Sequence, residues 1–161
     1  MAKTRRDKAA RIVDAAFEII VEQGWRAITL DAVAVRCGIE RAEVYRLTPS
    51  PAAILDLFAR RIDLALLDET APAPPEESDT GAVDGTGGGM ARDRLFDILM
   101  RRFEALAPYR AALGILARDL PRDPATVAAT LPQARRSFAL MLREAGIDDR
   151  GLRGAVRVAA L

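Results

Sequence analysis

The side chains best suited to chemistry in this 161-residue chain lie close together, between positions 29 and 46. They are hydrogen-bond donors and cations: Thr29, Arg41, Tyr45 and Arg46. Hydroxyl groups donate to anionic oxygens, and arginine presents a fork of N–H donors that matches planar acceptors. These residue types favour the binding of an anionic partner over catalysis.

The composition also argues against an enzyme. The chain has no histidine and one cysteine, Cys37, so a zinc site is improbable and an internal disulfide is excluded. No nucleophile stands beside a base, and no glycine-rich phosphate loop occurs within a strand-helix unit. Cys37 is interpreted as a small core residue and not as a redox sensor. The sequence therefore predicts no enzymatic activity and no cofactor.

Two short helices around a tight turn would position the donors. Thr29 is suited to cap the first helix, because its side-chain oxygen can accept from a backbone N–H one turn later. Leu30, Val33 and Ala34 recur at helical spacing and give this helix one apolar face. Gly38 can take the positive φ that the turn requires. The alternative interpretation is an ordinary corner between two helices of a helical protein.

The second helix is expected over residues 40–46. Val44 and Tyr45 should face back toward the first helix, and the outward face should carry Arg41, Ala42, Glu43 and Arg46. Two helices joined by a short turn that contains glycine form a helix-turn-helix, whose second helix can lie in a DNA major groove. Contact with double-stranded DNA is the function that this arrangement favours.

The charge distribution is local. The net charge is only +1, but residues 1–11 hold five basic groups against one acid, and residues 69–91 hold five acids and no base. Any nucleic-acid contact must therefore be local and not spread over the whole surface. The basic N-terminus could add phosphate contacts or could equally be a solvated end; its cations are Lys3, Arg5, Arg6 and Lys8.

Helical periodicity continues through the rest of the chain, and strand patterns are absent. A first helix is expected over 3–23, ended by Gly24. Trp25 should then cover the junction as a hydrophobic plug, with ligand stacking as the alternative. Residues 49–69 are expected to form a connector helix, capped by Ser50. Residues 70–91 are rich in Gly, Pro and acids and should form a flexible linker.

A C-terminal body is predicted over residues 92–161. Its helices should run over 92–106, from Pro108 to about 119, from Pro124 to a break at Pro132, and from there to Gly146. A last helix is expected from about 149 to the final residue. No apolar run approaches the roughly 20 residues of a membrane span, and no signal peptide is present at the N-terminus. The expected location is the cytoplasm.

The first 65 residues resemble the TetR/AcrR family of bacterial regulators. The sequence elements that carry the resemblance are Arg11-Ile12-Val13-Asp14-Ala15-Ala16, Glu22-Gln23-Gly24, the cap and helix from Thr29 to Val33, Cys37-Gly38-Ile39, and Val44-Tyr45-Arg46. The resemblance implies an all-α protein with a three-helix DNA-binding head, here residues 1–48. It also implies a separate helical body that binds a small ligand and dimerises through its last two helices. Residues 92–161 look like the first part of such a body.

The resemblance assigns roles to individual side chains. Thr29 and Tyr45 would bond phosphates and position the head, whereas Arg41, Ala42 and Arg46 would lie nearest the bases. For Tyr45 the alternative is a half-buried packing role. Where relatives have Phe before Pro-Ser-Lys, this chain has Thr48, and Pro51 replaces the Lys.

The recognition helix departs from the family by its acids. Glu40 replaces the usual Ser-like cap, and Glu43 adds a second negative charge. Because phosphate neutralisation supplies most nonspecific affinity, each protomer should bind DNA weakly and depend on dimerisation.

An apolar ligand pocket is predicted in the body. Its expected lining is Leu99, Met100, Phe103, Leu113, Leu116, Phe138, Met141 and Leu142. The ligand would be a hydrophobic small molecule that the sequence does not identify, and plain core packing is the alternative for this set. A rival function is a lipid-binding protein of the same fold that has lost DNA binding, similar to the accessory proteins of ubiquinone biosynthesis. Gly24-Trp25 and the missing Lys at position 51 favour that rival.

Overall fold

The computed structural model describes residues 2–69 and 87–146, and the regular structure within those two ranges is helical throughout. The α-helices are α1 (Ala2–Gln23), α2 (Leu30–Cys37), α3 (Arg41–Leu47), α4 (Pro51–Glu69), α5 (Gly87–Leu106), α6 (Arg110–Asp119) and α7 (Pro124–Glu144). Single-turn helices lie between them: η1 (Trp25–Ala27), η2 (Ala107–Tyr109) and η3 (Leu120–Arg122). The expected all-α fold is confirmed.

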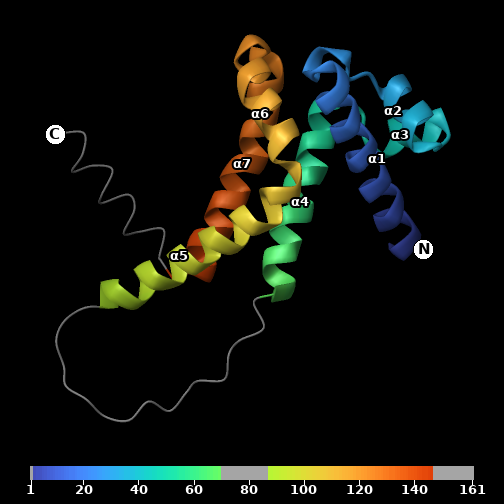
Figure 1. The fold of residues 1–161 in the computed structure, drawn as a ribbon. Coiled ribbons are helices and arrows are strands. Elements are labelled where there is room, and N and C mark those ends of the chain that lie inside the picture. Colours follow the sequence, from blue (N-terminus) through green and yellow to red (C-terminus); the bar gives the residue numbers. More distant parts are fainter. Residues whose placement is uncertain (1, 70–86, 147–161) are drawn as a thin grey trace.

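Helix α1 is the element against which α2, α4 and α6 pack. Figure 1 shows α2 and α4 beside it. Its apolar residues recur at helical spacing, so one face of the helix can be fully buried. That buried face consists of Ile12, Val13, Ala15, Ala16, Phe17, Ile19 and Ile20. Gly24 ends α1 with a φ of 84°, in the region that a side chain would disfavour. The first helix and its end were therefore predicted correctly.

Polar contacts fix α2 and its turn against α1. The guanidinium of Arg36 forms ion pairs with Glu22 at 2.6 Å and Glu18 at 3.3 Å. Arg11 donates from its terminal nitrogen to the carbonyl oxygen of Cys37 at 2.6 Å. Gly38 turns the chain with a φ of 61°. These contacts hold the helix-turn-helix in one orientation relative to α1.

The head and the body share one core. Phe17 of α1, Phe58 of α4 and Tyr109 of η2 form an aromatic cluster with ring centroids 4.4 to 5.3 Å apart. Ala112 and Leu116 of α6 belong to the same buried cluster as the head's apolar residues. Helix α6 therefore contributes to the core of the head, although it lies in the range predicted as the body.

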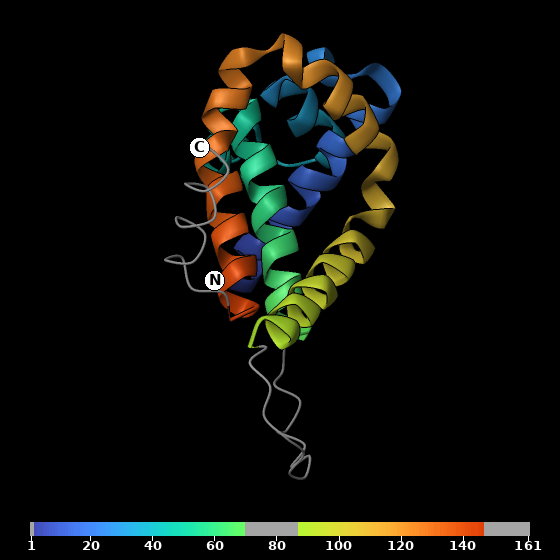
Figure 2. The same cartoon turned by 90° about the vertical axis from the view of Figure 1, so that its left-hand side faces the viewer.

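Helix α7 lies along α4, and α5 packs against both (Figure 2). A break at Pro132 was predicted, but α7 continues through it. A proline inside a helix costs about 3 kcal/mol, because it removes one hydrogen bond and crowds the preceding turn. Packing against α4 on the C-terminal side of Pro132 offsets that cost. Asp123 caps α7 by accepting from the backbone N–H of Thr126 at 3.1 Å.

The buried face of α7 differs from the predicted one. Ala134 and Phe138 were expected to point inward but are exposed, whereas Gln133 and Ser137 are buried. Both polar side chains donate to Asp63 of α4, Ser137 at 2.5 Å and Gln133 at 3.3 Å. The helix is therefore rotated so that its donors meet a buried carboxylate.

Two predicted segments lie partly or wholly outside the described residues. The linker was expected to extend to residue 91, but α5 begins at Gly87, so residues 87–91 are helical. Glycine lowers helix propensity without forbidding the helix, and three in succession led to the wrong boundary. Residues 70–86 and the expected last helix belong to the undescribed segments. Within the described ranges, no helix is both long enough and apolar enough to cross a membrane.

Candidate nucleic-acid interface

Helix α3 lies at one end of the molecule and turns one face to solvent (Figure 1). Val44 is fully buried and anchors α3 in the core of the head. Three of the predicted outer residues, Arg41, Ala42 and Arg46, are exposed. Tyr45 was expected to face back toward the first helix, but it is 43% exposed.

Asp31 of α2 contacts two of these outer side chains. Its Oδ1 atom lies 2.7 Å from the Nε of Arg41, and the hydroxyl of Tyr45 donates to the same oxygen at 3.2 Å. The guanidinium carbon of Arg41 lies 5.5 Å from the centre of the Tyr45 ring. The three side chains therefore form one cluster on the exposed surface, here called the Asp31 cluster.

Glu43 does not face outward as predicted, and its side chain is only 21% exposed. It turns back to α1, where Lys8 donates to both of its carboxylate oxygens at 2.7 Å. Arg46 lies 3.3 Å away on the other side. The hydrogen bonds from Lys8 lower the pKa of Glu43 below its ordinary value, with a smaller contribution from Arg46. The second acid of the recognition helix is thus neutralised within the head.

The N-terminal cations divide into two groups. Arg5 and Lys8 join Arg46 around an open cleft of about 560 Å³ between α1 and α3, which Thr4, Glu43 and Leu47 also line. Arg6 is exposed on α1 outside this cleft. The side chain of Lys3 lies outside the described residues. Arg5 and Lys8 of α1 therefore lie beside Arg46 of α3 at this cleft.

Thr29 caps α2 as predicted, since its Oγ1 accepts from the backbone N–H of Ala32 at 3.1 Å. The hydroxyl remains able to donate a hydrogen bond toward an anionic oxygen.

At the start of α4, the side-chain oxygen of Ser50 accepts from the backbone N–H of Ala53 at 3.3 Å. Thr48, which stands where an aromatic was expected, is fully buried and donates to the Val44 carbonyl at 2.9 Å. A small polar residue thus ends α3 where a large ring would be expected to anchor α4.

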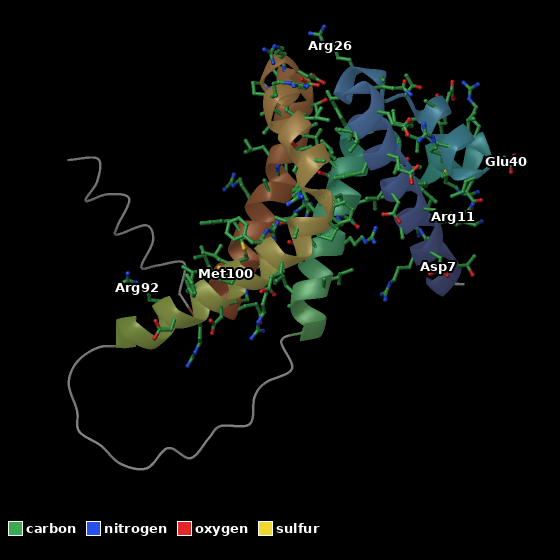
Figure 3. The ribbon with its side chains drawn as sticks, viewed as in Figure 1. Asp7, Arg11, Arg26, Glu40, Arg92 and Met100 are labelled. Carbon is green, nitrogen blue, oxygen red and sulfur yellow. The ribbon has the colours of Figure 1, made fainter. Side chains whose placement is uncertain are left out.

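The side chains predicted to line a ligand pocket are not gathered into one cavity in the part of the chain that the structure describes. Leu113 and Leu116 of α6 belong to the core around α1, whereas Met141 of α7 and Leu99 of α5 belong to a second, smaller cluster. The buried or half-buried members are Leu99, Leu113, Leu116, Met141 and Leu142. The exposed members are Met100, Phe103 and Phe138, and Figure 3 labels Met100 on α5.

Asp31 and the role of Lys8 were missed by the sequence analysis. An acid in the first turn of a helix is favoured by the helix dipole, so Asp31 gave no indication of a contact with another helix. Lys8 and Glu43 are 35 residues apart, and only the fold brings α1 and α3 close enough for them to meet.

Trp25 is a buried plug as predicted, and its indole N–H donates to Asp123 at 3.1 Å.

The comparisons with known proteins concern this same region. Residues 12–59 match the family model described as bacterial regulatory proteins, tetR family. The matched segment contains α2, α3 and the Asp31 cluster, and it begins after the basic end of α1. A search of curated proteins gave no match.

Proposed function

We propose that this chain, whose N-terminal head belongs to the TetR family of bacterial regulators, is a ligand-responsive repressor that binds operator DNA as a homodimer in the cytoplasm. One observation carries the proposal. The residues that would contact DNA share the exposed face of α3, while Val44 fastens the opposite face to the core. A short helix held from behind can enter a major groove without rearranging the head.

Each side chain of the interface has a role that its chemistry suits. Arg41 and Arg46 are 68% and 73% exposed and can reach base edges, where arginine pairs with guanine. Thr29 offers a hydroxyl donor to a phosphate oxygen. Tyr45 can do the same only when its hydroxyl turns away from Asp31, to which it donates at 3.2 Å. Arg5, which forms no ion pair within the described residues, can add a phosphate contact from α1. Because Lys8 neutralises Glu43, the acid on α3 opposes binding less than the sequence alone indicated.

The homodimer proposal is supported by the apolar residues that α5 and α7 expose. Phe96, Met100 and Phe103 recur along one face of α5, and Leu131 and Phe138 are exposed on α7. Exposed apolar patches of this kind commonly mark protein interfaces. A two-fold dimer would present two α3 helices to successive major grooves, about 34 Å apart.

The ligand is proposed to be a hydrophobic small molecule. Met100, Phe103 and Phe138 of the predicted set are exposed, so they could contact an apolar ligand that a second copy of the chain helps to enclose. A ligand bound at this surface would change how the copies pack, and so the spacing of the two heads.

The test uses the full chain and a duplex selected by that chain from a random-sequence library. Fluorescence anisotropy gives the Kd for this duplex and for a scrambled duplex of equal length at two salt concentrations. Arg46→Ala should weaken binding to the selected duplex by about 5- to 100-fold, because a base contact is lost. Arg110→Ala, at an exposed arginine of α6, is the matched control and should leave the Kd unchanged.

Two outcomes would contradict the proposal. The first is a selection that enriches no sequence. The second is DNA binding that Arg46→Ala leaves intact. Copurifying isoprenoid or acyl lipid together with no DNA affinity at low salt would instead favour the lipid-binding rival.

A further inference from the structure

Asp31 is an unexpected residue at a DNA-facing surface. It lies two residues after the DNA-facing cap Thr29 and is about half exposed. A carboxylate beside phosphates opposes association, because phosphate neutralisation drives nonspecific binding. The acid therefore lowers affinity unless its contacts within the protein compensate.

Those contacts involve two of the residues assigned to DNA. A single oxygen of Asp31 lies 2.7 Å from the Nε of Arg41 and 3.2 Å from the hydroxyl of Tyr45. No other ion pair is formed by Arg41 within the described residues, so its two terminal nitrogens remain free for a planar acceptor. The ion pair keeps the guanidinium of Arg41 beside Asp31 through its Nε side.

The ring of Tyr45 completes the arrangement, since the guanidinium carbon of Arg41 lies 5.5 Å from its centre. A long arginine side chain loses rotamer freedom when it binds, and that loss weakens the complex. A side chain already held by a carboxylate and an aromatic ring loses less. The Asp31 cluster thus orders Arg41 before DNA arrives.

We propose that Asp31 is a positioning residue that sets the sequence specificity of the head. It holds Arg41 and Tyr45 in one arrangement, which favours the duplex that matches that arrangement. Its charge weakens binding to every other duplex, where no base contact compensates for repulsion from the phosphates. This inference rests on the proposed DNA-binding function.

Glu40 provides a matched control. It precedes α3, is exposed, and forms no ion pair in the described part of the chain; Figure 3 shows it pointing away from the other helices. Replacing either acid by its amide removes one negative charge from the same end of the molecule. Only at position 31 does the change also affect the hold on Arg41 and Tyr45.

The experiment measures Kd for the selected and the scrambled duplex over a series of salt concentrations. Asp31→Asn should tighten binding to the scrambled duplex several-fold and lower the ratio of the two affinities by about tenfold. Glu40→Gln should tighten binding to both duplexes equally and leave the ratio unchanged. Asp31→Glu keeps the charge but moves the carboxylate, so the ratio should fall while binding to the scrambled duplex stays constant.

The results separate this inference from the function on which it rests. If the wild-type chain discriminates between the duplexes and Asp31→Asn behaves like Glu40→Gln, Asp31 acts only as a charge and the inference is wrong. If the wild-type chain does not discriminate, the proposed function fails as well. Thermal melting of each variant, followed by circular dichroism, tells a lost contact from an unfolded head.

Discussion

Two arginine–carboxylate pairs in this molecule have the same length and different surroundings. In the Asp31 cluster, Arg41 lies 2.7 Å from a carboxylate and the two side chains are 68% and 49% exposed. Between α5 and α4, Arg102 lies 2.7 Å from Asp63, and those side chains are 19% and 11% exposed. The distance between the charged atoms therefore does not by itself show whether an ion pair contributes to the stability of the fold or to binding.

The two pairs differ in how easily water can replace one side chain as the partner of the other. Water competes for the exposed pair, so it adds little to the stability of the fold, and the terminal nitrogens of Arg41 stay accessible to DNA. Asp63 has lost most of its water and depends on Arg102, Gln133 and Ser137 for its hydrogen bonds. The exposed pair is suited to recognition, and the buried one to fixing how α4, α5 and α7 pack.

The largest expected effect is on the buried pair. Asp63→Ala leaves the guanidinium of Arg102 half-desolvated and two polar side chains without their acceptor, so the free energy of unfolding should fall by about 3 kcal/mol. Urea denaturation measures it. The control is Asp14→Ala, which removes the exposed partner of Arg61, also at 2.7 Å, and should cost less than about 1 kcal/mol. Equal losses in the two variants would mean that burial does not distinguish these pairs.

An intermediate effect is expected at Arg41. Arg41→Ala should change the free energy of unfolding by less than about 1 kcal/mol, because its ion pair is exposed. The same variant should weaken binding to the selected duplex by about 5- to 100-fold. Urea denaturation and anisotropy on one preparation give both numbers. A large loss of stability with unchanged DNA binding would reverse the roles given to the two pairs.

The smallest expected effect is on how the stability of the fold changes at low pH. The hydrogen bonds from Lys8 place the pKa of Glu43 in the folded protein below its ordinary value of 4.5. The Lys8–Glu43 contact should therefore stabilise the head fully above about pH 4.5, and its contribution should disappear as the pH falls through the lower, folded-state pKa. Melting temperatures from pH 7 to pH 3 should decline less steeply for Glu43→Gln than for the wild-type chain. Parallel curves would show that the pair contributes nothing to stability.

Most of the head could be predicted from local patterns. Thr29, Gly38, Ser50 and Gly24 each mark a helix end through their own backbone or side-chain chemistry, and each was placed correctly. Such features depend on residues within one turn of each other, and sequence reasoning is most reliable there. Helical spacing around Val44 placed Arg41, Ala42 and Arg46 outward correctly. It put Tyr45 and Glu43 on the wrong faces, because both side chains contact neighbouring helices.

The body was predicted less well because its buried face is partly polar. Counting apolar residues placed Phe138 inside, whereas Asp63, distant in the sequence, draws Ser137 to the interface in its place. The same approach broke α7 at Pro132, because it could not weigh packing along α4 against the cost of one proline. Asp31 was missed for a similar reason, since its partners lie on the next helix.

The hydrogen bond between the Trp25 indole and Asp123 gives the molecule a natural optical reporter. Trp25 is the one tryptophan of the chain, it is buried, and it joins the end of α1 to the start of α7. Any movement that draws the body away from the head would expose this indole to water and shift its emission to longer wavelength. Changes in the intrinsic fluorescence of the unlabelled protein therefore follow one defined contact.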